Sequence, residues 1–252
     1  FAPRLAEAFG WQTVLGLATI PASIVFFVYT FMAKDAPEYK KIRLEDETRS
    51  YFRVLKERDT WWLCLFYLVT FGGFVGLASS LVIYFNDQYG LDPVNAGNFT
   101  AVCVFIGSMV RPLGGKLADK IGGTRALKVL YVVVALSMFA VSFGLPSPWL
   151  ALLFFALCMC SLGMGNGAVF QLVPQRFRKD IGNITGIVGT AGAIGGFFLA
   201  SLLGYSKEWT GSYQVGFLMF VALVVISFVG IWAVKSKWRT HWEAAGMEKV
   251  KI

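Results

Sequence analysis

The chain has 252 residues, of which 56% are hydrophobic, 16% are aromatic and only 15% are charged. Soluble domains carry about 25% charged residues, so this composition excludes an ordinary soluble domain and indicates a protein that crosses a membrane several times. The net charge of +8 comes from basic residues in the connections between membrane spans. We therefore expect no nucleic-acid partner.

The sequence contains seven stretches long enough to cross a bilayer. A transmembrane helix needs about 20 predominantly apolar residues. The stretches that meet this length are residues 11–32, 61–85, 96–117, 126–145, 149–172, 182–204 and 213–234. We predict an all-α polytopic membrane protein with these spans.

Basic residues concentrate in alternate connections between the spans. Residues 33–60, 116–128, 173–181 and 235–252 hold 20 of the 23 Lys and Arg residues. Cytoplasmic loops of membrane proteins carry an excess of Lys and Arg. We expect a multi-pass protein of the inner (plasma) membrane with its C-terminus in the cytoplasm, so that the lipid bilayer is one of its partners.

The ends and the long connection suggest a division into parts. The chain begins at Phe1 without an initiator Met or a signal peptide, so we expect it to be truncated at its N-terminus. Residues 33–60 mix both signs of charge and exceed the other connections in length. We predict a last helix of a preceding bundle at 1–32, a cytoplasmic linker at 33–60, a six-helix bundle at 61–234 and a cytoplasmic basic tail at 235–252.

The second span carries an aromatic stripe. Tyr67, Phe71 and Phe74 are spaced at i, i+4 and i+7, which places them on one side of a helix. The stripe is either core packing or the lining of a ligand path, and the Tyr67 hydroxyl adds a hydrogen-bond donor for an anion.

Arg111 lies inside the third span. Apart from residues at their cytoplasmic ends, the spans contain no Asp, Glu, Lys or His, so no in-span carboxylate can pair with Arg111. A charge at membrane depth is costly and marks a functional site, and a planar guanidinium suits a small planar oxyanion. Gly107, Gly114 and Gly115 clear a face for a ligand or a neighbouring helix. We interpret Arg111 as an anion-binding residue; the alternative is that it snorkels to the cytoplasmic surface or contacts backbone carbonyls.

The fifth and sixth spans are rich in glycine. In the fifth, Gly163, Gly167 and Phe170 share one face, and Asn166 lies one turn before Phe170. An amide at this depth serves interhelical hydrogen bonding or ligand contact. In the sixth, glycines three and four residues apart form a smooth stripe that suits close packing and sliding. They are Gly182, Gly186, Gly189, Gly192, Gly195 and Gly196.

No pattern in the sequence points to catalysis, a metal or a cofactor. The four cysteines lie within apolar runs, where we interpret them as packing residues. We therefore expect no enzyme activity, no metal and no cofactor. A seven-helix receptor or retinal protein is an alternative from a different class, but a retinal protein would need a Lys in the last span, and 213–234 has none.

Residues 114–125, GGKLADKIGGTR, resemble the short-loop signature of the major facilitator superfamily. The matching residues are Gly115, Asp119, Lys120, Gly122 and Arg125. The resemblance implies a twelve-helix transporter made of two six-helix bundles, of which this chain would hold helices six to twelve. It also implies that Asp119 contacts the start of a neighbouring helix and holds the cytoplasmic side closed.

More narrowly, the chain resembles the C-terminal half of the nitrate/nitrite porter family. The resemblance rests on YLVTFGGFVG at 67–76, RPLGGKLADKIGGTR at 111–125, GNGAVFQLVP at 165–174 and GTAGAIGGFF at 189–198, the last being similar to that family's nitrate signature. It implies that a second Arg, from the missing N-terminal bundle, binds nitrate or nitrite together with this chain. The candidate binding residues of this chain are Arg111, Tyr67, Phe71, Phe170, Asn166, Gly189 and Gly192.

The implied activity is transport of nitrate or nitrite by alternating access, in which two bundles rock about an anion bound between them. Proton symport and nitrate/nitrite exchange are both open, and we expect a monomer at full length. The alternative substrate is another small or organic anion.

Overall fold

The computed structural model describes residues 2–34 and 51–244 of the chain, and these residues are almost entirely helical. Two helices lie in the first range, α1 (Ala2–Phe9) and α2 (Trp11–Met32). The second range begins with a helix at residues 51–56. Then follow α4 (Arg58–Tyr67), the π-helix η1 (Leu68–Gly72), α5 (Gly73–Tyr89), α6 (Pro93–Met109), α7 (Arg111–Ile121), α8 (Gly123–Ser142), α9 (Pro148–Arg176), the 3₁₀-helix η2 (Arg178–Asp180), α10 (Ile181–Thr210) and α11 (Gln214–Ala244).

Seven helical segments of the described residues are long and apolar enough to cross a membrane, and each coincides with a predicted span. They are Trp11–Met32, Arg58–Tyr89, Pro93–Ile121, Gly123–Ser142, Pro148–Arg176, Ile181–Thr210 and Gln214–Trp238. The predicted all-α class with seven spans is therefore confirmed. Several helices continue past the predicted bounds, because a helix does not have to end where its apolar stretch ends.

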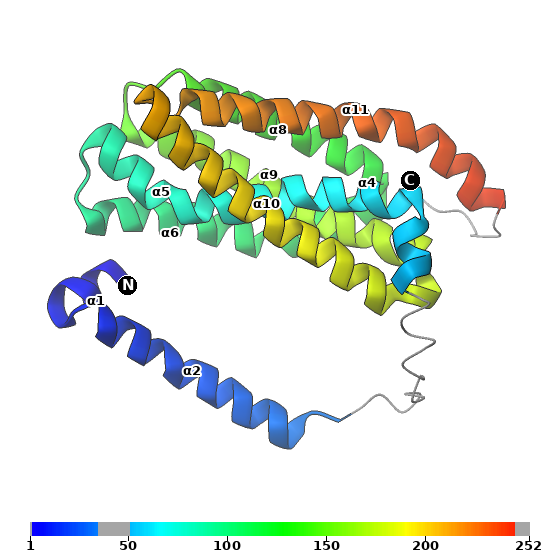
Figure 1. The fold of residues 1–252 in the computed structure, drawn as a ribbon, viewed down its shortest axis with the longest axis horizontal. Coiled ribbons are helices and arrows are strands. Elements are labelled where there is room, and N and C mark those ends of the chain that lie inside the picture. The colour runs from blue at the N-terminus through cyan, green and yellow to red at the C-terminus, as the bar shows by residue number, and fades with distance from the viewer. Residues whose placement is uncertain (1, 35–50, 245–252) are drawn as a thin grey trace.

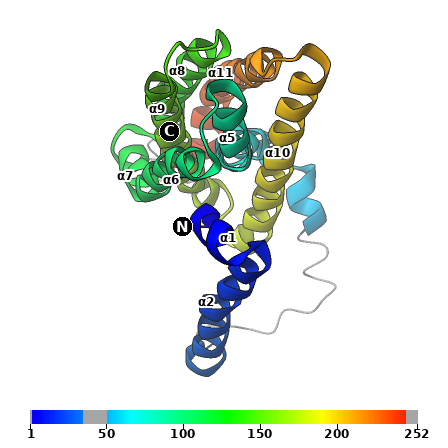
Figure 2. The same ribbon diagram turned by 90° about the vertical axis from the view of Figure 1, so that its left-hand side faces the viewer.

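The helices from α4 onward pack into one bundle, and α2 stands apart from it (Figures 1 and 2). None of the residues of α2 is buried. Part of the predicted linker, 35–50, and the end of the predicted tail, 245–252, lie outside the described residues. The predicted boundaries at 60 and 234 fall inside helices, since α4 begins at Arg58 and α11 continues to Ala244.

Helix α9 lies at the centre of the bundle, where it contacts α6, α7 and α8. Glycines let the backbones meet: a Cβ atom on Gly163 would collide with the carbonyl oxygen of Gly107, and one on Gly114 with that of Met164. The glycine face that the sequence predicted beside Arg111 is thus covered by a neighbouring helix.

A second close contact joins α10 to the π-helix. A Cβ atom on Gly72 would lie 2.6 Å from Cα of Gly195, and one on Gly195 would lie 2.5 Å from the carbonyl oxygen of Leu68. A π-turn widens the helix by one residue and is frequent at functional sites. In this chain it contains Phe71, while Tyr67 ends α4 and Phe74 lies in α5, so the aromatic stripe extends across the widened turn.

The third predicted span is broken into α6 and α7 at Val110. Pro112 has no N–H group, so it cannot continue the hydrogen-bond ladder of α6. The N–H groups of Leu113 and Gly114 instead bond to the carbonyl of Val110, at 3.0 and 3.1 Å. The break makes Arg111 the first residue of a new helix in the middle of the span.

Candidate functional site

Arg111 is held by aromatic faces at the start of α7. Its guanidinium carbon lies 4.6 Å from the ring centre of Phe74 and 5.7 Å from that of Phe71, a range in which an aromatic face attracts a cation. Within the described part of the chain its guanidinium makes no hydrogen bond or ion pair, and its Nε atom is buried without a partner. The positive end of the α7 dipole adds to the positive charge at this position.

The predicted aromatic residues form a continuous wall beside Arg111. The rings of Tyr67 and Phe71 stack at 5.0 Å with an angle of 7° between their planes. Phe170, from α9, meets the Tyr67 ring edge-on at 4.9 Å and 83°. The structure therefore brings together Tyr67, Phe71, Phe170 and Arg111 from three separate spans, and it adds Phe74, which the sequence placed only on the stripe.

The two candidate glycines of α10 have different surroundings. A Cβ atom on Gly192 would lie 2.6 Å from Cδ1 of Tyr67 and 2.9 Å from Cδ1 of Phe71, so this position requires glycine. A Cβ atom on Gly189, one turn earlier, would have no neighbour within 4 Å. Gly192 thus supports the aromatic wall, whereas Gly189 faces open space.

Asn166 is buried near this wall, with an exposed fraction of 4%. Among the residues that the structure describes, neither polar atom of its amide has a hydrogen-bond partner, and neither does the hydroxyl of Thr70 in η1, which is 1% exposed. Sequence reasoning did not find Thr70, because a threonine in a span carries no signal of its own. Gly163 and Gly167 pack on α6 and α7, whereas Phe170 reaches Tyr67 of α4, so the face predicted for these three residues serves two different neighbours.

The short-loop residues lie at the end of α7 and in its connection to α8. Gly122 alone joins the two helices, with φ of 96°, a value that favours glycine. Asp119 is exposed and forms no hydrogen bond or ion pair with any described residue; it lines a cavity of about 400 Å³ together with Gln171, Gln175 and Arg178. Lys120 and Arg125 are exposed, and a Cβ atom on Gly115 would lie 3.9 Å from the carbonyl oxygen of Gly167.

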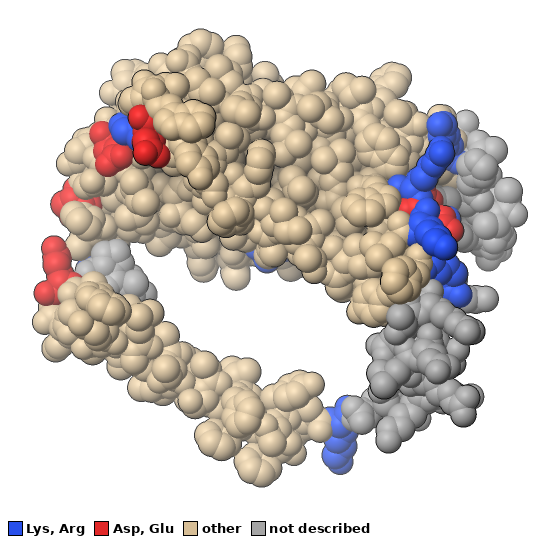
Figure 3. Space-filling view, in the orientation of Figure 1, with Lys and Arg blue, Asp and Glu red and all other residues tan. Residues whose placement is uncertain are grey.

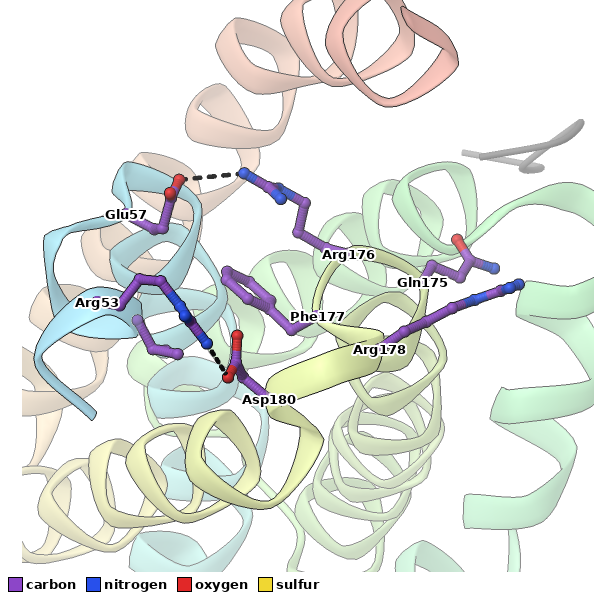
Figure 4. A pocket seen from close by; sticks show the side chains of 8 residues that line it. Arg53, Glu57, Gln175, Arg176, Phe177, Arg178 and Asp180 are labelled. Carbon is purple, nitrogen blue, oxygen red and sulfur yellow. Dashed lines mark hydrogen bonds and ion pairs between the residues drawn. The ribbon is translucent and has the colours of Figure 1, made fainter. Parts of the chain in front are cut away.

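A second cavity, of about 320 Å³, opens at the same end of the bundle (Figure 4). Two of its three arginines, Arg53 and Arg176, are paired with carboxylates. Arg53 pairs with Asp180 at 2.5 Å, and Arg176 pairs with Glu57 at 3.1 Å. Arg176 also donates to Asp59 at 2.6 Å, and the Trp238 indole donates to the other oxygen of Asp59 at 2.7 Å. This charge network ties the ends of α4, α9 and α11 together.

Most charged side chains gather at the two ends of the bundle, and the surface between them is uncharged in this view apart from a small basic patch (Figure 3). One end carries Arg53, Arg176 and Arg178. The opposite end carries Asp87 and Asp92, in and beside the turn between α5 and α6. Arg111 lies inside the bundle and has no carboxylate partner among the described residues, unlike Arg53 and Arg176 at the end of the bundle.

Comparison with known proteins gives one family match. The profile of the Major Facilitator Superfamily matches residues 1–200. Similar proteins include the nitrite extrusion protein of Bacillus subtilis (strain 168), which is 33% identical over 247 residues that cover 96% of this chain and 61% of that protein.

Two further relatives carry related descriptions. The probable nitrate transporter NarT of Staphylococcus carnosus (strain TM300) is 35% identical over 244 residues, which cover 95% of this chain and 61% of that protein. The probable nitrate/nitrite antiporter NarK1 of Thermus thermophilus is 29% identical over 242 residues, which cover 87% and 53%. The chain spans less than two thirds of the length of these relatives.

Proposed function

The chain belongs to the Major Facilitator Superfamily, and from this premise we propose that it forms part of a transporter that carries nitrate and nitrite across a membrane. It is a multi-pass membrane protein. The similarity to nitrite and nitrate transport proteins at 33 and 35% identity supports the choice of substrate.

The observation that carries the proposal is an unpaired guanidinium inside an aromatic wall. Nitrate and nitrite are planar and spread one negative charge over their oxygens, so a guanidinium fork can bind two oxygens at once. The rings of Phe71 and Phe74 stabilise the cation without accepting conventional hydrogen bonds from it, so its N–H donors would be available to the anion. In a site with little water such donors act strongly on a small anion.

We further propose that the anion binds between this bundle, residues 61–234, and a first six-helix bundle to which α2 belongs. Alternating access would then rock the two bundles about the bound anion. The open surface at Gly189 and the aromatic wall at Gly192 would face the substrate path. A second Arg, from the first bundle, would bind the anion together with Arg111.

The proposed orientation follows the basic residues. Cytoplasmic loops carry the excess of Lys and Arg, so the end with Arg53, Arg176 and Arg178 would face the cytoplasm of the inner membrane. Asp119 lies at this end without an ion pair to any described residue, and its carboxylate would bind the positive N-terminus of a helix in the first bundle. That contact would hold the cytoplasmic side closed.

The test is transport of nitrate and nitrite into proteoliposomes that contain the two-bundle protein. Arg111→Lys keeps the charge but loses the planar fork, so we expect roughly a tenfold or greater fall in nitrate affinity, since each 1.4 kcal/mol is tenfold. Arg53→Lys, at the paired and exposed end, is the matched control. Unchanged affinity in a folded Arg111→Lys protein would refute the proposal for Arg111.

The same assay separates the two coupling modes. Exchange needs no proton carrier in the protein, so nitrite inside the vesicles would accelerate nitrate entry. Symport would instead respond to an imposed pH gradient with no anion inside. Preference for a larger organic anion over nitrate would favour the alternative substrate class.

A further inference from the structure

Three basic residues gather where the start of α8 meets the second half of α11. These two helices lie side by side, on the side of the bundle that faces away from α2 (Figures 1 and 2). The ammonium of Lys128, on α8, lies 4.5 Å from the ring centre of Trp232, on α11, a range in which an aromatic face attracts a cation. Arg125 precedes Lys128 by three residues and Lys235 follows Trp232 by three, so each lies beside its neighbour on the same helix.

The three cations adjoin one another and have no carboxylate among them. The positive charges of Arg125 and Lys235 both repel the Lys128 ammonium. None of the three forms an ion pair with any residue that the structure describes, and neither α8 nor residues 214–238 of α11 contain Asp or Glu. Like charges held together raise the free energy of the fold unless an anion lies among them. The cluster therefore indicates a binding site for an anion.

An apolar strip continues from this cluster along both helices. Val132 and Leu136 follow Lys128 by four and eight residues, and both are exposed. Val229 and Val225 precede Trp232 by three and seven residues, and both are exposed as well. Residues at these spacings share one side of a helix. The strip is thus suited to lipid acyl chains, since both helices are long and apolar enough to cross a membrane.

The Trp232 ring is 67% exposed at the boundary between the cluster and the strip. Trp side chains are enriched where a membrane meets water. This position puts the cluster at the depth of lipid headgroups and the apolar strip at the depth of acyl chains.

We propose that Arg125, Lys128 and Lys235 bind the phosphate headgroup of an anionic phospholipid, whose acyl chains lie along the apolar strip of α8 and α11. Basic pockets between membrane helices on the cytoplasmic side bind such headgroups. Trp232 restrains the Lys128 side chain, which lowers the entropy cost of binding. The site lies apart from the aromatic wall around Arg111 and goes beyond the proposed transport of nitrate and nitrite.

Lys207 provides a matched control at the opposite end of the bundle. Its ammonium lies 5.1 Å from the ring centre of Tyr213, so it makes the same kind of contact as Lys128. The Tyr213 hydroxyl donates to the carboxylate of Asp87 at 2.8 Å. Lys207 therefore has an acidic neighbour where Lys128 has two basic ones, and we expect no anionic lipid there.

The test titrates the lipid-free two-bundle protein, in detergent, with phosphatidylglycerol or phosphatidylcholine and measures bound lipid by native mass spectrometry. Wild type should bind phosphatidylglycerol more tightly than phosphatidylcholine. Lys128→Met should weaken phosphatidylglycerol binding roughly fivefold, and Lys128→Met combined with Lys235→Met roughly twentyfold, since each basic residue near an anionic headgroup adds a similar increment. Lys128→Arg and Lys207→Met should bind it as wild type does. If Lys128→Met folds poorly, Lys235→Met alone should show the fivefold loss with the contact between Lys128 and Trp232 intact.

Three results would overturn the inference. They are equal affinity of wild type for the two lipids, equal losses in Lys128→Met and Lys207→Met, and displacement of phosphatidylglycerol by an equal concentration of glycerol phosphate, which would assign the site to a soluble phosphate ester. Nitrate affinity of the same proteins should not change in any of these variants. A wild-type protein that prefers phosphatidylglycerol but binds neither nitrate nor nitrite would refute the proposed function and support the lipid site.

Discussion

The sharpest prediction concerns Gly192, the glycine of α10 that touches the aromatic wall. An alanine there would place its Cβ atom 2.6 and 2.7 Å from Cδ1 and Cε1 of Tyr67 and 2.9 Å from Cδ1 of Phe71. Carbon atoms in contact are normally about 3.5–4.0 Å apart. The Tyr67 ring would have to move by roughly 1 Å, although Phe71 and Phe170 pack against it.

Two opposing effects determine how much Gly192→Ala changes the stability of the protein. Overpacking a well-packed position costs about 1–3 kcal/mol, while replacing glycine by alanine in a helix gains roughly 0.8–1.0 kcal/mol. Gly204 lies on the same helix with no neighbour within 4 Å of its Cβ position, so Gly204→Ala has the helix gain without the overpacking. The difference in stability between the two variants isolates the overpacking, and we expect it to be about 1–3 kcal/mol.

The assay has two parts. Thermal unfolding in detergent compares Gly192→Ala with Gly204→Ala and with wild type. Nitrate binding to the two-bundle protein then shows whether displacement of the wall reaches the ligand, and we expect affinity to fall roughly tenfold in Gly192→Ala and to remain unchanged in Gly204→Ala. Equal stability of the two variants would show that the wall yields freely; wild-type affinity in Gly192→Ala would show that Tyr67 and Phe71 do not wall the anion site.

Two further predictions concern the ends of the bundle. Arg176→Met should destabilise the protein by about 1–2 kcal/mol, because it removes the hydrogen bonds that Arg176 donates to Asp59 and Glu57 in a partly exposed network. Arg53→Met, whose side chain is 63% exposed, should cost less than about 1 kcal/mol in the same thermal unfolding experiment. Equal losses would contradict the role given to the network. Asp92 caps the start of α6, and hydrogen bonds from Asn95 lower the pKa of its carboxyl group. The ionised carboxylate therefore stabilises the fold above the pKa that Asp92 has in the unfolded chain, about 3.9. This stabilisation is lost as pH falls through the lower pKa of Asp92 in the folded chain. Unfolding midpoints measured from pH 5 to pH 3 should fall less steeply in Asp92→Asn than in wild type, and parallel curves would refute the assignment.

The seven membrane-spanning segments and their helical type could be predicted from the sequence, because apolar length is a property of each segment by itself. The aromatic stripe could be predicted for the same reason, since Tyr67 and Phe71 lie one turn apart on one helix. The break at Val110 also had a local signal in Pro112, although the sequence analysis treated 96–117 as one span. The sequence also identified Arg111 as a charge inside a span without a partner, because the predicted spans contain no carboxylate away from their ends.

The tertiary structure decided which neighbour covers each helix face. Gly189 and Gly192 look alike in the sequence, yet only Gly192 meets the rings of Tyr67 and Phe71. The sequence left two neighbours possible for the glycine face beside Arg111, a ligand or a helix, and in the structure α9 covers it. The position of Thr70 opposite Gly165 likewise depends on how α9 packs. Helical periodicity determines which residues share a face, but the partner of that face comes from segments far away along the chain, so their packing alone determines it.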